Sequence, residues 1–539
     1  MYAGEITTQS ALIFMTDPHI YRWSNKLVLF GIGILILAYL AALGFHLPQQ
    51  ATHMIVAAQG DHHATNQSHK ETSEKLTEIK IETPPPLWMV LPFALMLGVI
   101  AVFPLIPGVS HWWEINLHRF YIAAVLALVM LGYYFWMHNQ PIEGHWPVHH
   151  MIMHSESGPN YQTTWGVLAN AMLNEYVPFI VLLFSLFTIS GGIHLEGDFP
   201  AHSFTNAIFL LVGGALASFI GTTGAAMLLI RPLLDTNSER KHVSHTVIFF
   251  IFVVCNCGGC LLPIGDPPLF LGYLMGVPFL YTLALWKEWL FINGILILIY
   301  YFWDRFWFYP HETIVDIARD ETQVRALKIS GIWPNAFLLV GVIICVALLD
   351  PSKTVPGTAW HPWLYLREIV QLLLVAISLI LGSRQARLDN NFNYHAIIEV
   401  AVLFFGIFIT MQPALQILAI CGPSLGLIDP RHFFWITGML SSVLDNAPTY
   451  VVFFTTAQSV TAKLGLPTPI AGVSEPLLEA ISLGAVFMGA NTYIGNGPNF
   501  MVKAIAEKSG VKMPGFFGYM LYSCGFLIPL FILVTFLFF

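Results

Sequence analysis

Long apolar segments recur along this chain from residue 27 to its C-terminal end, and they constrain the fold more than any other feature. Each approaches the length of about 20 residues that an α-helix needs to cross the hydrocarbon core of a bilayer. Of the 539 residues, 56% are hydrophobic and 10% are charged, whereas soluble domains carry about 25% charged residues. A transmembrane β-barrel would instead alternate apolar and polar positions. The sequence therefore predicts an all-α polytopic membrane protein.

The apolar pattern divides the chain into four parts. Residues 1–170 are expected to form an N-terminal extension with three transmembrane helices and two polar outer loops. The helices are predicted at residues 27–47, 87–107 and 120–138, and the loops at 49–86 and 139–173. The other parts are a first repeat at 171–303, a cytoplasmic linker with connecting helices at 304–394, and a second repeat at 395–539. In all we expect about 11 to 13 spanning segments.

The distribution of Lys and Arg predicts which loops face the cytoplasm. Residues 139–173 contain neither residue type, whereas residues 304–331 contain three Arg and one Lys, and residues 383–394 contain two Arg. Because cytoplasmic loops carry an excess of Lys and Arg, the first segment is expected outside and the other two inside. The same rule places the N-terminus in the cytoplasm. The membrane is expected to be of the bacterial inner (plasma) membrane type.

Four histidines lie in the polar connection that is predicted to face outward. They are His145, His149, His150 and His154. Histidine-rich tracts of this kind can bind a transition metal. The alternative is a solvated loop with interfacial aromatic residues, a role that Trp146 and Trp165 fit.

Two segments of the chain resemble each other and predict an internal repeat. Residues 218–221 align with residues 442–445 at an offset of 224, and residues 265–270 align with residues 495–500 at an offset of 230. The first copy is expected to begin outside and the second inside, so the repeats are predicted to be inverted. Inverted repeats allow one fold to build two opposite-facing states.

Each copy contains two places where Gly and Pro interrupt an apolar segment. The expected helix breaks are Gly221, Gly265, Pro267, Pro268, Pro448, Gly495 and Pro498. Interruptions of this kind free backbone carbonyls and expose helix N-termini, which can then serve as ion ligands. One such interruption could be a simple kink, but four at repeat-related positions favour a binding site.

Two aspartates lie beside these interruptions, at membrane depth. A carboxylate there is costly and indicates a functional site. Asp445 is the first candidate and Asp266 the second, although Asp266 could instead cap the half-helix that follows it. Neutral oxygen ligands surround both in the sequence, namely Thr222, Thr223, Asn446, Asn491, Thr492 and Asn496.

The four interrupted segments resemble a known group of transporters. GTTGAAMLLIRPLL, GGCLLPIGDPPLFLG, LDNAPTYVVF and GANTYIGNGPNF are similar to motifs of the ion transporter superfamily. The resemblance is closest to the NhaD-type sodium/proton antiporters and the putative citrate transporter family, and it covers residues 171–539. It implies two inverted repeats, each with a discontinuous helix and a re-entrant hairpin, the hairpin tips being at 221–223 and 445–447. It also implies a homodimer.

The charges of the predicted site favour a cation as substrate. An organic anion would need compensating positive charge in a low-dielectric site, and the one fixed cation near the first tip is Arg231. The tips also lack the Ser-Asn-Thr motif of the dicarboxylate branch. Sodium prefers oxygen ligands, so we expect a sodium ion at Asp445 and Asn446. Burial favours the protonated form of a carboxyl group, so protons can compete with sodium there.

Glu175 and Glu399 are separated by the repeat offset of 224 and are predicted to stand at the starts of two helices. They are candidates for a proton relay. The alternative is that each is solvated at a helix end, where a negative charge is favourable.

The sequence therefore predicts a sodium/proton antiporter that exchanges both ions at a shared intramembrane carboxylate. The alternative is a sodium-coupled carrier of citrate or another dicarboxylate, and an arsenite-type exporter is a third possibility. No set of nucleophile and base accompanies the histidines, and no phosphate-binding Gly loop is present, so we do not expect an enzyme. No cofactor is expected beyond sodium as substrate or coupling ion. The expected partners are sodium ions, protons, the lipid bilayer and a second copy of the chain, and not nucleic acid.

Overall fold

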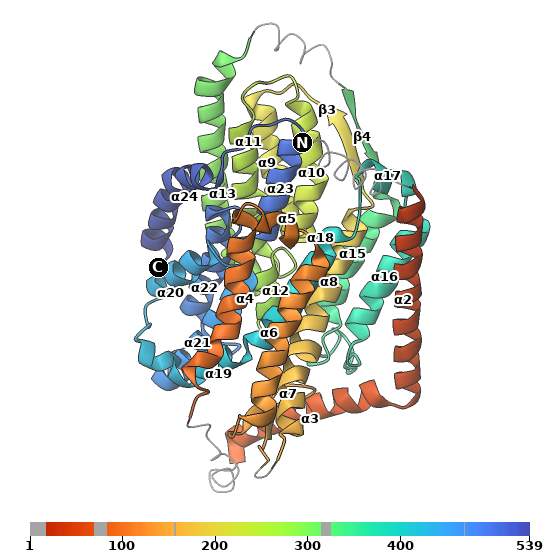
Figure 1. Cartoon of the computed structure of the whole chain (residues 1–539), viewed down its shortest axis with the longest axis vertical. Coiled ribbons are helices and arrows are strands. Elements are labelled where there is room, and N and C mark those ends of the chain that lie inside the picture. Colours follow the sequence, from red (N-terminus) through yellow and green to blue (C-terminus); the bar gives the residue numbers. More distant parts are fainter. Residues whose placement is uncertain (1–17, 69–82, 156–157, 314–324, 468) are drawn as a thin grey trace.

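The computed structural model describes residues 18–68, 83–155, 158–313, 325–467 and 469–539. It is mostly helical (Figure 1), with short two-stranded pairings as its only sheets in the described ranges. Eight helices are long and apolar enough to cross a membrane, or nine if one bent pair counts as a span. They are Ser24–Gly44, Leu87–Leu105, Asn116–Trp136, Tyr161–Ser190, Ser203–Ile220, Ser244–Leu261, Tyr281–His311 and Phe516–Phe538. The all-α polytopic membrane fold is thereby confirmed.

The number of long spans is smaller than predicted because several apolar segments are divided into shorter helices. α16 (Leu366–Leu381) has 16 residues and α22 (Glu475–Met488) has 14. Helices of this length are marginal for spanning about 30 Å of hydrocarbon.

The N-terminal extension contains four main helices. They are α2 (Pro18–Gly44), α3 (Leu47–Ser68), α4 (Leu91–Val102) and α6 (Asn116–Trp136). The prediction of a loop at 49–86 is wrong for residues 49–68, which belong to α3; residues 69–82 lie outside the described part of the chain. The first half of α3 contains two Ala, two Gln and one Met, residue types that favour helix. α6 packs against the second repeat, where Gly406 leaves room for the Cβ atom of Ala123.

The connection after α6 is shorter than predicted. Strands β1 (Ile142–Gly144) and β2 (His150–Ile152) form a hairpin. A continuous helical rod then begins at Tyr161 and consists of α7 (Tyr161–Ala169), the π-helix η4 (Asn170–Tyr176) and α8 (Val177–Ser190). Glu175 is therefore in the middle of a span, and the prediction that it starts a helix is wrong. The apolar signal of α7 was hidden by its polar residues Gln162, Thr163 and Thr164.

Residues 203–274 contain the two interrupted segments of the first repeat. Their elements are α9 (Ser203–Ile220), α10 (Thr222–Thr236), α11 (Ser244–Val253), η5 (Cys257–Leu261) and α12 (Pro267–Leu274). Gly221 joins α9 to α10 with a φ of +80°, a conformation that favours glycine. α13 (Trp286–Trp303) follows.

Residues 430–508 contain the two interrupted segments of the second repeat. They follow α18 (His395–Thr410) and α19 (Gln412–Cys421). Their elements are α20 (Pro430–Ser441), α21 (Asn446–Leu464), α22, η10 (Gly489–Asn491) and α23 (Gly497–Lys508), and α24 (Phe516–Phe538) ends the chain. In Figure 1, α9 to α11 occupy the upper part of the molecule, and α20 to α22 lie at the lower left.

Each repeat contains a close backbone contact between two glycines, and the two contacts are at equivalent positions. A Cβ atom on Gly265 would lie 2.2 Å from the carbonyl oxygen of Gly259, and one on Gly495 would lie 2.6 Å from that of Gly489. Both contacts are related by the offset of 230 residues. This shared packing supports the repeat, and the inverted orientation of its copies stays a prediction.

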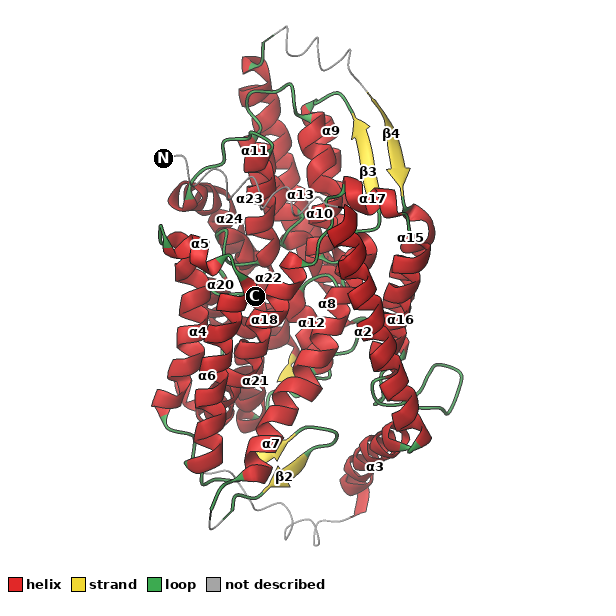
Figure 2. Ribbon diagram, turned by 45° about the vertical axis from the view of Figure 1, so that its right-hand side comes forward, coloured by secondary structure: helices red, strands yellow, loops and turns green. Residues whose placement is uncertain are grey.

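The segment without Lys or Arg and the Arg-containing segments lie at opposite ends of the molecule (Figure 2). The β1–β2 hairpin and α3 are at one end, whereas α17 (Arg384–Asp389) and the pair of β3 (His194–Asp198) and β4 (Arg325–Ser330) are at the other. α15 (Ile332–Leu348) and α16 run between these ends. The segments that were predicted outside and inside are thus separated along the long axis, as that prediction requires.

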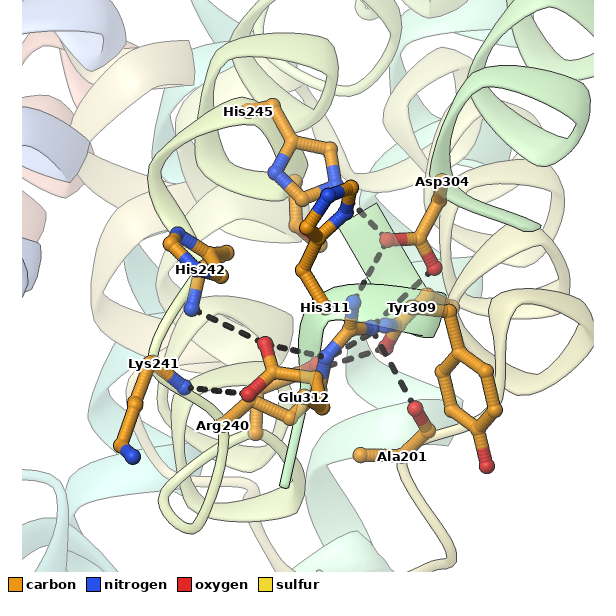
Figure 3. A network of polar contacts seen from close by, with 12 residues as sticks. Ala201, Arg240, Lys241, His242, His245, Asp304, Tyr309, His311 and Glu312 are labelled. Carbon is orange, nitrogen blue, oxygen red and sulfur yellow. Dashed lines mark hydrogen bonds and ion pairs between the residues drawn. The ribbon is translucent and has the colours of Figure 1, made fainter. Parts of the chain in front are cut away.

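A buried polar network fixes the far end of α13 (Figure 3). The guanidinium of Arg240 donates two hydrogen bonds to Asp304, of 2.6 and 3.1 Å, and Nε2 of His245 lies 2.8 Å from the same carboxylate. Glu312 accepts hydrogen bonds of 3.0 Å from the backbone N–H groups of Lys241 and His242. The network joins the α10–α11 turn to the π-helical end of α13.

Candidate ion-binding site

Asp266 lies at the centre of a set of hydrogen bonds from both repeats. Its Oδ1 accepts from Thr222 Oγ1 at 3.1 Å and from Asn496 Nδ2 at 3.2 Å, and its Oδ2 accepts from Asn446 Nδ2 at 2.7 Å. All four residues are buried. We call Thr222, Asp266, Asn446 and Asn496, together with Asp445, the central site.

The helix breaks explain why these side chains meet. Thr222 and Asn446 are the first residues of α10 and α21, and Asp266 and Asn496 immediately precede α12 and α23. Proline occupies the first turn of both α12 and α23, where its missing N–H costs nothing. Four helix N-termini therefore converge on one carboxylate, and their partial positive charge stabilises negative charge between them.

Asp445 lies at the second hairpin tip but has a different role in the structure. It is half-buried, and its Oδ1 accepts a hydrogen bond of 3.1 Å from the N–H of Ala447. It therefore caps α21, and Pro448 sits in the first turn of that helix. Asp445 is close enough to Asp266 for the two charges to interact.

The remaining predicted ligands surround this centre unequally. Asn491 Nδ2 donates to Ser442 Oγ at 2.9 Å, and Thr492 Oγ1 donates to the carbonyl of Ser442. These two residues hold the second tip rather than Asp266 itself. On the first tip, Thr222 and not Thr223 donates the hydrogen bond to the carboxylate.

Two buried amide oxygens near the tips have no donor among the described residues. They are Oδ1 of Asn446 and Oδ1 of Asn491. A buried acceptor without a donor is costly unless a proton donor or a cation satisfies it. Both residues were predicted as oxygen ligands, and these atoms are free to act as such.

No Lys or Arg side chain forms an ion pair with Asp266 or Asp445 in the described ranges. Arg231, the one cation near the first tip in the described ranges, instead interacts electrostatically with Asp235 of the same helix. The central site thus combines two carboxyl groups with neutral donors. Such a site can hold a proton or a hard cation.

Two asparagines that were not predicted as site residues, Asn256 and Asn499, complete the surroundings of the site. Asn256 Nδ2 donates to Asn499 Oδ1 at 2.8 Å, and Asn496 Nδ2 also approaches Asn256 Oδ1 at 3.3 Å. Both are fully buried. Their signal was present, since a buried amide in the apolar CNCGGC segment requires hydrogen-bond partners.

A large cavity lies beside the central site. It has a volume of about 760 Å³ and follows α12 and α21, whose N-terminal ends form the site. Leu271 and Tyr273 of α12 and Val451 and Thr455 of α21 line it, whereas Asp266 does not. The cavity therefore runs along the two half-helices without reaching the central carboxylate.

The two predicted relay residues lie in different surroundings. Glu175 lines the large cavity, with its Oε2 buried and unpartnered among the described residues. Glu399 instead forms an ion pair of 2.9 Å with Arg119 on α6 of the extension. The structure does not bring the two glutamates together, and their proton-relay role stays a prediction.

Comparison with known proteins identifies the family. A family model described as "Putative citrate transport" matches residues 124–539. The chain belongs to this family. No curated protein matched the chain. The matched range contains both predicted repeats and begins within α6. The family assignment and the apolar helices together indicate an integral membrane transporter.

Proposed function

We propose that this transporter exchanges sodium ions for protons at the central site. The observation that carries the proposal is Asp266, a fully buried carboxyl group with three neutral hydrogen-bond donors and no basic partner in the described part of the chain. An isolated buried carboxylate is unstable unless a cation or a proton neutralises it. Exchange of one for the other on the same group is antiport.

The geometry also supplies ligands for the cation. Asp445 directly precedes Asn446, whose Nδ2 contacts Asp266 and whose amide oxygen is free. The amide oxygen of Asn491 is likewise free. Carboxylate and amide oxygens suit a hard cation such as sodium. Compared with the expectation from sequence, the proposal gives Asp266 the central role and makes Asp445 its partner.

Helix N-termini can bind anions, but the N–H groups of two helix N-termini at this site already have acceptors. The N–H of Thr222 donates to the carbonyl of Gly265 at 2.9 Å, and that of Ala447 donates to Asp445. The amide side chains already face Asp266. An added anion would therefore meet two carboxyl groups and occupied donors.

The charges of the large cavity also favour a cation. Four carboxylates and two basic side chains line it, apart from histidines. Lys353 pairs with Asp350 at 3.3 Å, and Arg367 pairs with Glu368 at 2.7 Å. The two glutamates that remain, Glu143 and Glu175, have no Lys or Arg partner in the described ranges.

One observation favours a second candidate, a sodium-coupled carrier of citrate or another dicarboxylate. The cavity of about 760 Å³ is large enough for an organic acid, and the description of the family names citrate. In that case the central site would hold the coupling sodium, and the acid would bind from the cavity side near Arg367.

The proposal is tested by proton flux in proteoliposomes that contain the purified full chain. Sodium, lithium, potassium and citrate are added separately to vesicles with a pH gradient, for the wild type and for Asp266→Asn and Asp445→Asn. We expect sodium alone to dissipate the gradient in the wild type, and Asp266→Asn to reduce this flux at least 100-fold.

A control variant distinguishes loss of function from loss of fold. Glu507→Gln changes an exposed carboxylate that pairs with Lys503 on the surface, so its flux should match the wild type. Flux that requires citrate would support the second candidate. Sodium-driven flux that survives in Asp266→Asn would contradict the proposed role of that residue.

The orientation in the membrane is proposed from the positions of the Lys and Arg residues in the loops. We propose a bacterial-type inner membrane with the Arg-rich end of the molecule, including α17, in the cytoplasm. A homodimer is proposed from the family resemblance, and cross-linking in the native membrane tests it.

A further inference from the structure

We propose that Glu143, His145 and His149 form a binding site for a divalent transition metal of the zinc class. Glu143 lies in β1, His145 directly follows that strand, and His149 directly precedes β2. This hairpin is at the end of the molecule opposite β3 and β4. The proposal is independent of the ion exchanged at the central site.

The three side chains face one another. Nδ1 of His149 lies 3.2 Å from one carboxylate oxygen of Glu143, and Nε2 of His145 lies 3.7 Å from the other. The centres of the two imidazole rings are 4.6 Å apart, and the candidate ligand atoms all lie within 4.8 Å of one another. Small rotations of exposed side chains would bring all three to one ion.

This arrangement suits a metal better than two separate ion pairs. Two protonated imidazoles would repel each other at this distance. Two neutral imidazoles can instead bind the same cation, whose charge the carboxylate then balances. Two nitrogen ligands and one oxygen ligand are typical of zinc and its transition-metal neighbours, not of sodium, magnesium or calcium.

A buried residue holds the backbone of the ligands in place. Asn170 accepts a hydrogen bond of 2.7 Å from the N–H of His145 and donates one of 2.8 Å to the carbonyl of Glu143. Between them, Gly144 is in close contact with His150, because a Cβ atom there would lie 2.6 Å from its ring. The ligand segment is thereby fixed before any metal binds, which lowers the entropic cost of binding.

The site opens toward the large cavity. Glu143, His145 and His149 all line its wall. Three protein ligands leave at least one position of a zinc ion for water or another small ligand. A metal bound here would therefore be reached from the cavity and would add positive charge at its rim.

The test is metal binding by the full chain, purified in detergent without a histidine tag and stripped with a chelator. Zinc is titrated by calorimetry, and cobalt is titrated by its visible absorption. We expect one strong site per chain, weakened at least 100-fold in His145→Asn/His149→Asn and at least 10-fold in Glu143→Gln.

His150→Asn is the matched control. His150 is exposed in the same hairpin, but its Nδ1 contacts the carbonyl of Val148 at 2.8 Å and it is not part of the cluster. Its variant should bind metal as the wild type does, and X-ray absorption of the zinc complex should show two imidazole ligands. The proposal is overturned if the wild type binds no metal with one-to-one stoichiometry, if the double variant retains binding, or if His150→Asn loses it equally.

Discussion

Asn446 donates a hydrogen bond of 2.7 Å from its side chain to Oδ2 of Asp266, although 180 residues separate them in the chain. Asn446 begins α21 in the second repeat, and Asp266 precedes α12 in the first. The contact joins the hairpin tip of one repeat to the helix break of the other. Any movement that separates the repeats at this point must therefore replace this hydrogen bond, and a bound cation could do so.

The two threonines of the first tip should have different effects on ion binding. Thr222→Val removes the hydroxyl that donates to Asp266 at 3.1 Å, a hydrogen bond to a charged group that contributes about 1.5–3 kcal/mol. We expect the sodium concentration for half-maximal flux to rise about tenfold or more. Thr223→Val, which removes the adjacent hydroxyl, should change it less than about twofold. Equal effects of both substitutions in the flux assay would argue against the central position of Asp266.

The close contact between Gly259 and Gly265 should make Gly265 intolerant of a side chain. In Gly265→Ala the new Cβ atom would lie 2.2 Å from a backbone oxygen, which cannot move as a flexible side chain can. We expect a loss of stability of at least about 1–3 kcal/mol, measured by thermal unfolding in detergent. Gly525→Ala in α24 meets nothing within 4 Å and should be neutral. A stable Gly265→Ala variant would contradict the packing.

Much of this architecture could be predicted from the sequence because hydropathy and helix-breaking residues act locally. The apolar segments predicted the helical membrane fold, and Gly221 and the Pro267-Pro268 pair lie at helix interruptions. The same local reasoning failed at Glu175, since a polar helical turn in α7 resembles a loop when its neighbours are unknown. α3 was missed for the same reason.

The arrangement of the site could not be predicted to the same extent. The sequence identified Asp266 and Asp445 as candidates but ranked Asp445 first, because an Asp before two prolines, as at Asp266, could simply cap the following half-helix. In the structure Asp266 receives donors from three different helices, whereas Asp445 caps its own helix. Those contacts connect residues 44, 180 and 230 positions apart, a separation over which local patterns carry no information.

The buried pair of Arg240 and Asp304 should matter more for stability than any surface pair. Asp304→Asn removes the carboxylate that pairs with both Arg240 and His245. It leaves Arg240 with the more distant Glu312, 3.6 Å from its Nε, so the loss should approach the cost of about 3–5 kcal/mol for breaking a buried ion pair. Glu507→Gln, at the exposed partner of Lys503, should cost less than about 1 kcal/mol. Both are measured as shifts of the unfolding transition.

A double variant distinguishes an uncompensated charge from a general packing defect. Arg240→Gln/Asp304→Asn removes both charges of the pair, and Glu312, which also contacts Arg240, keeps its hydrogen bonds from the backbone N–H groups of Lys241 and His242. The double variant should therefore be more stable than Asp304→Asn alone. If the double variant is less stable than either single variant, the ion pair is not the cause.

His138 should make the folded protein less stable in mild acid. Burial lowers the pKa of this histidine to about 4, and the nearby His154 lowers it further. In the unfolded chain the pKa is about 6.5, so unfolding takes up a proton at pH values between about 4 and 6.5. Stability is therefore complete above pH 6.5 and decreases as the pH falls, by about 2 kcal/mol at pH 5.

The variant His138→Gln isolates this contribution. It removes the titrating group from a buried position between Tyr133 and Asn160, so its stability should decrease less between pH 7 and pH 5 than that of the wild type, by about 2 kcal/mol. The measurement is denaturant unfolding in detergent, followed by tryptophan fluorescence at both pH values. His150→Gln, an exposed histidine in the β1–β2 hairpin, is the control and should behave as the wild type. Because all other acidic and basic groups are shared, an identical pH dependence in the wild type and His138→Gln would show that His138 takes up its proton in the folded protein as readily as in the unfolded chain.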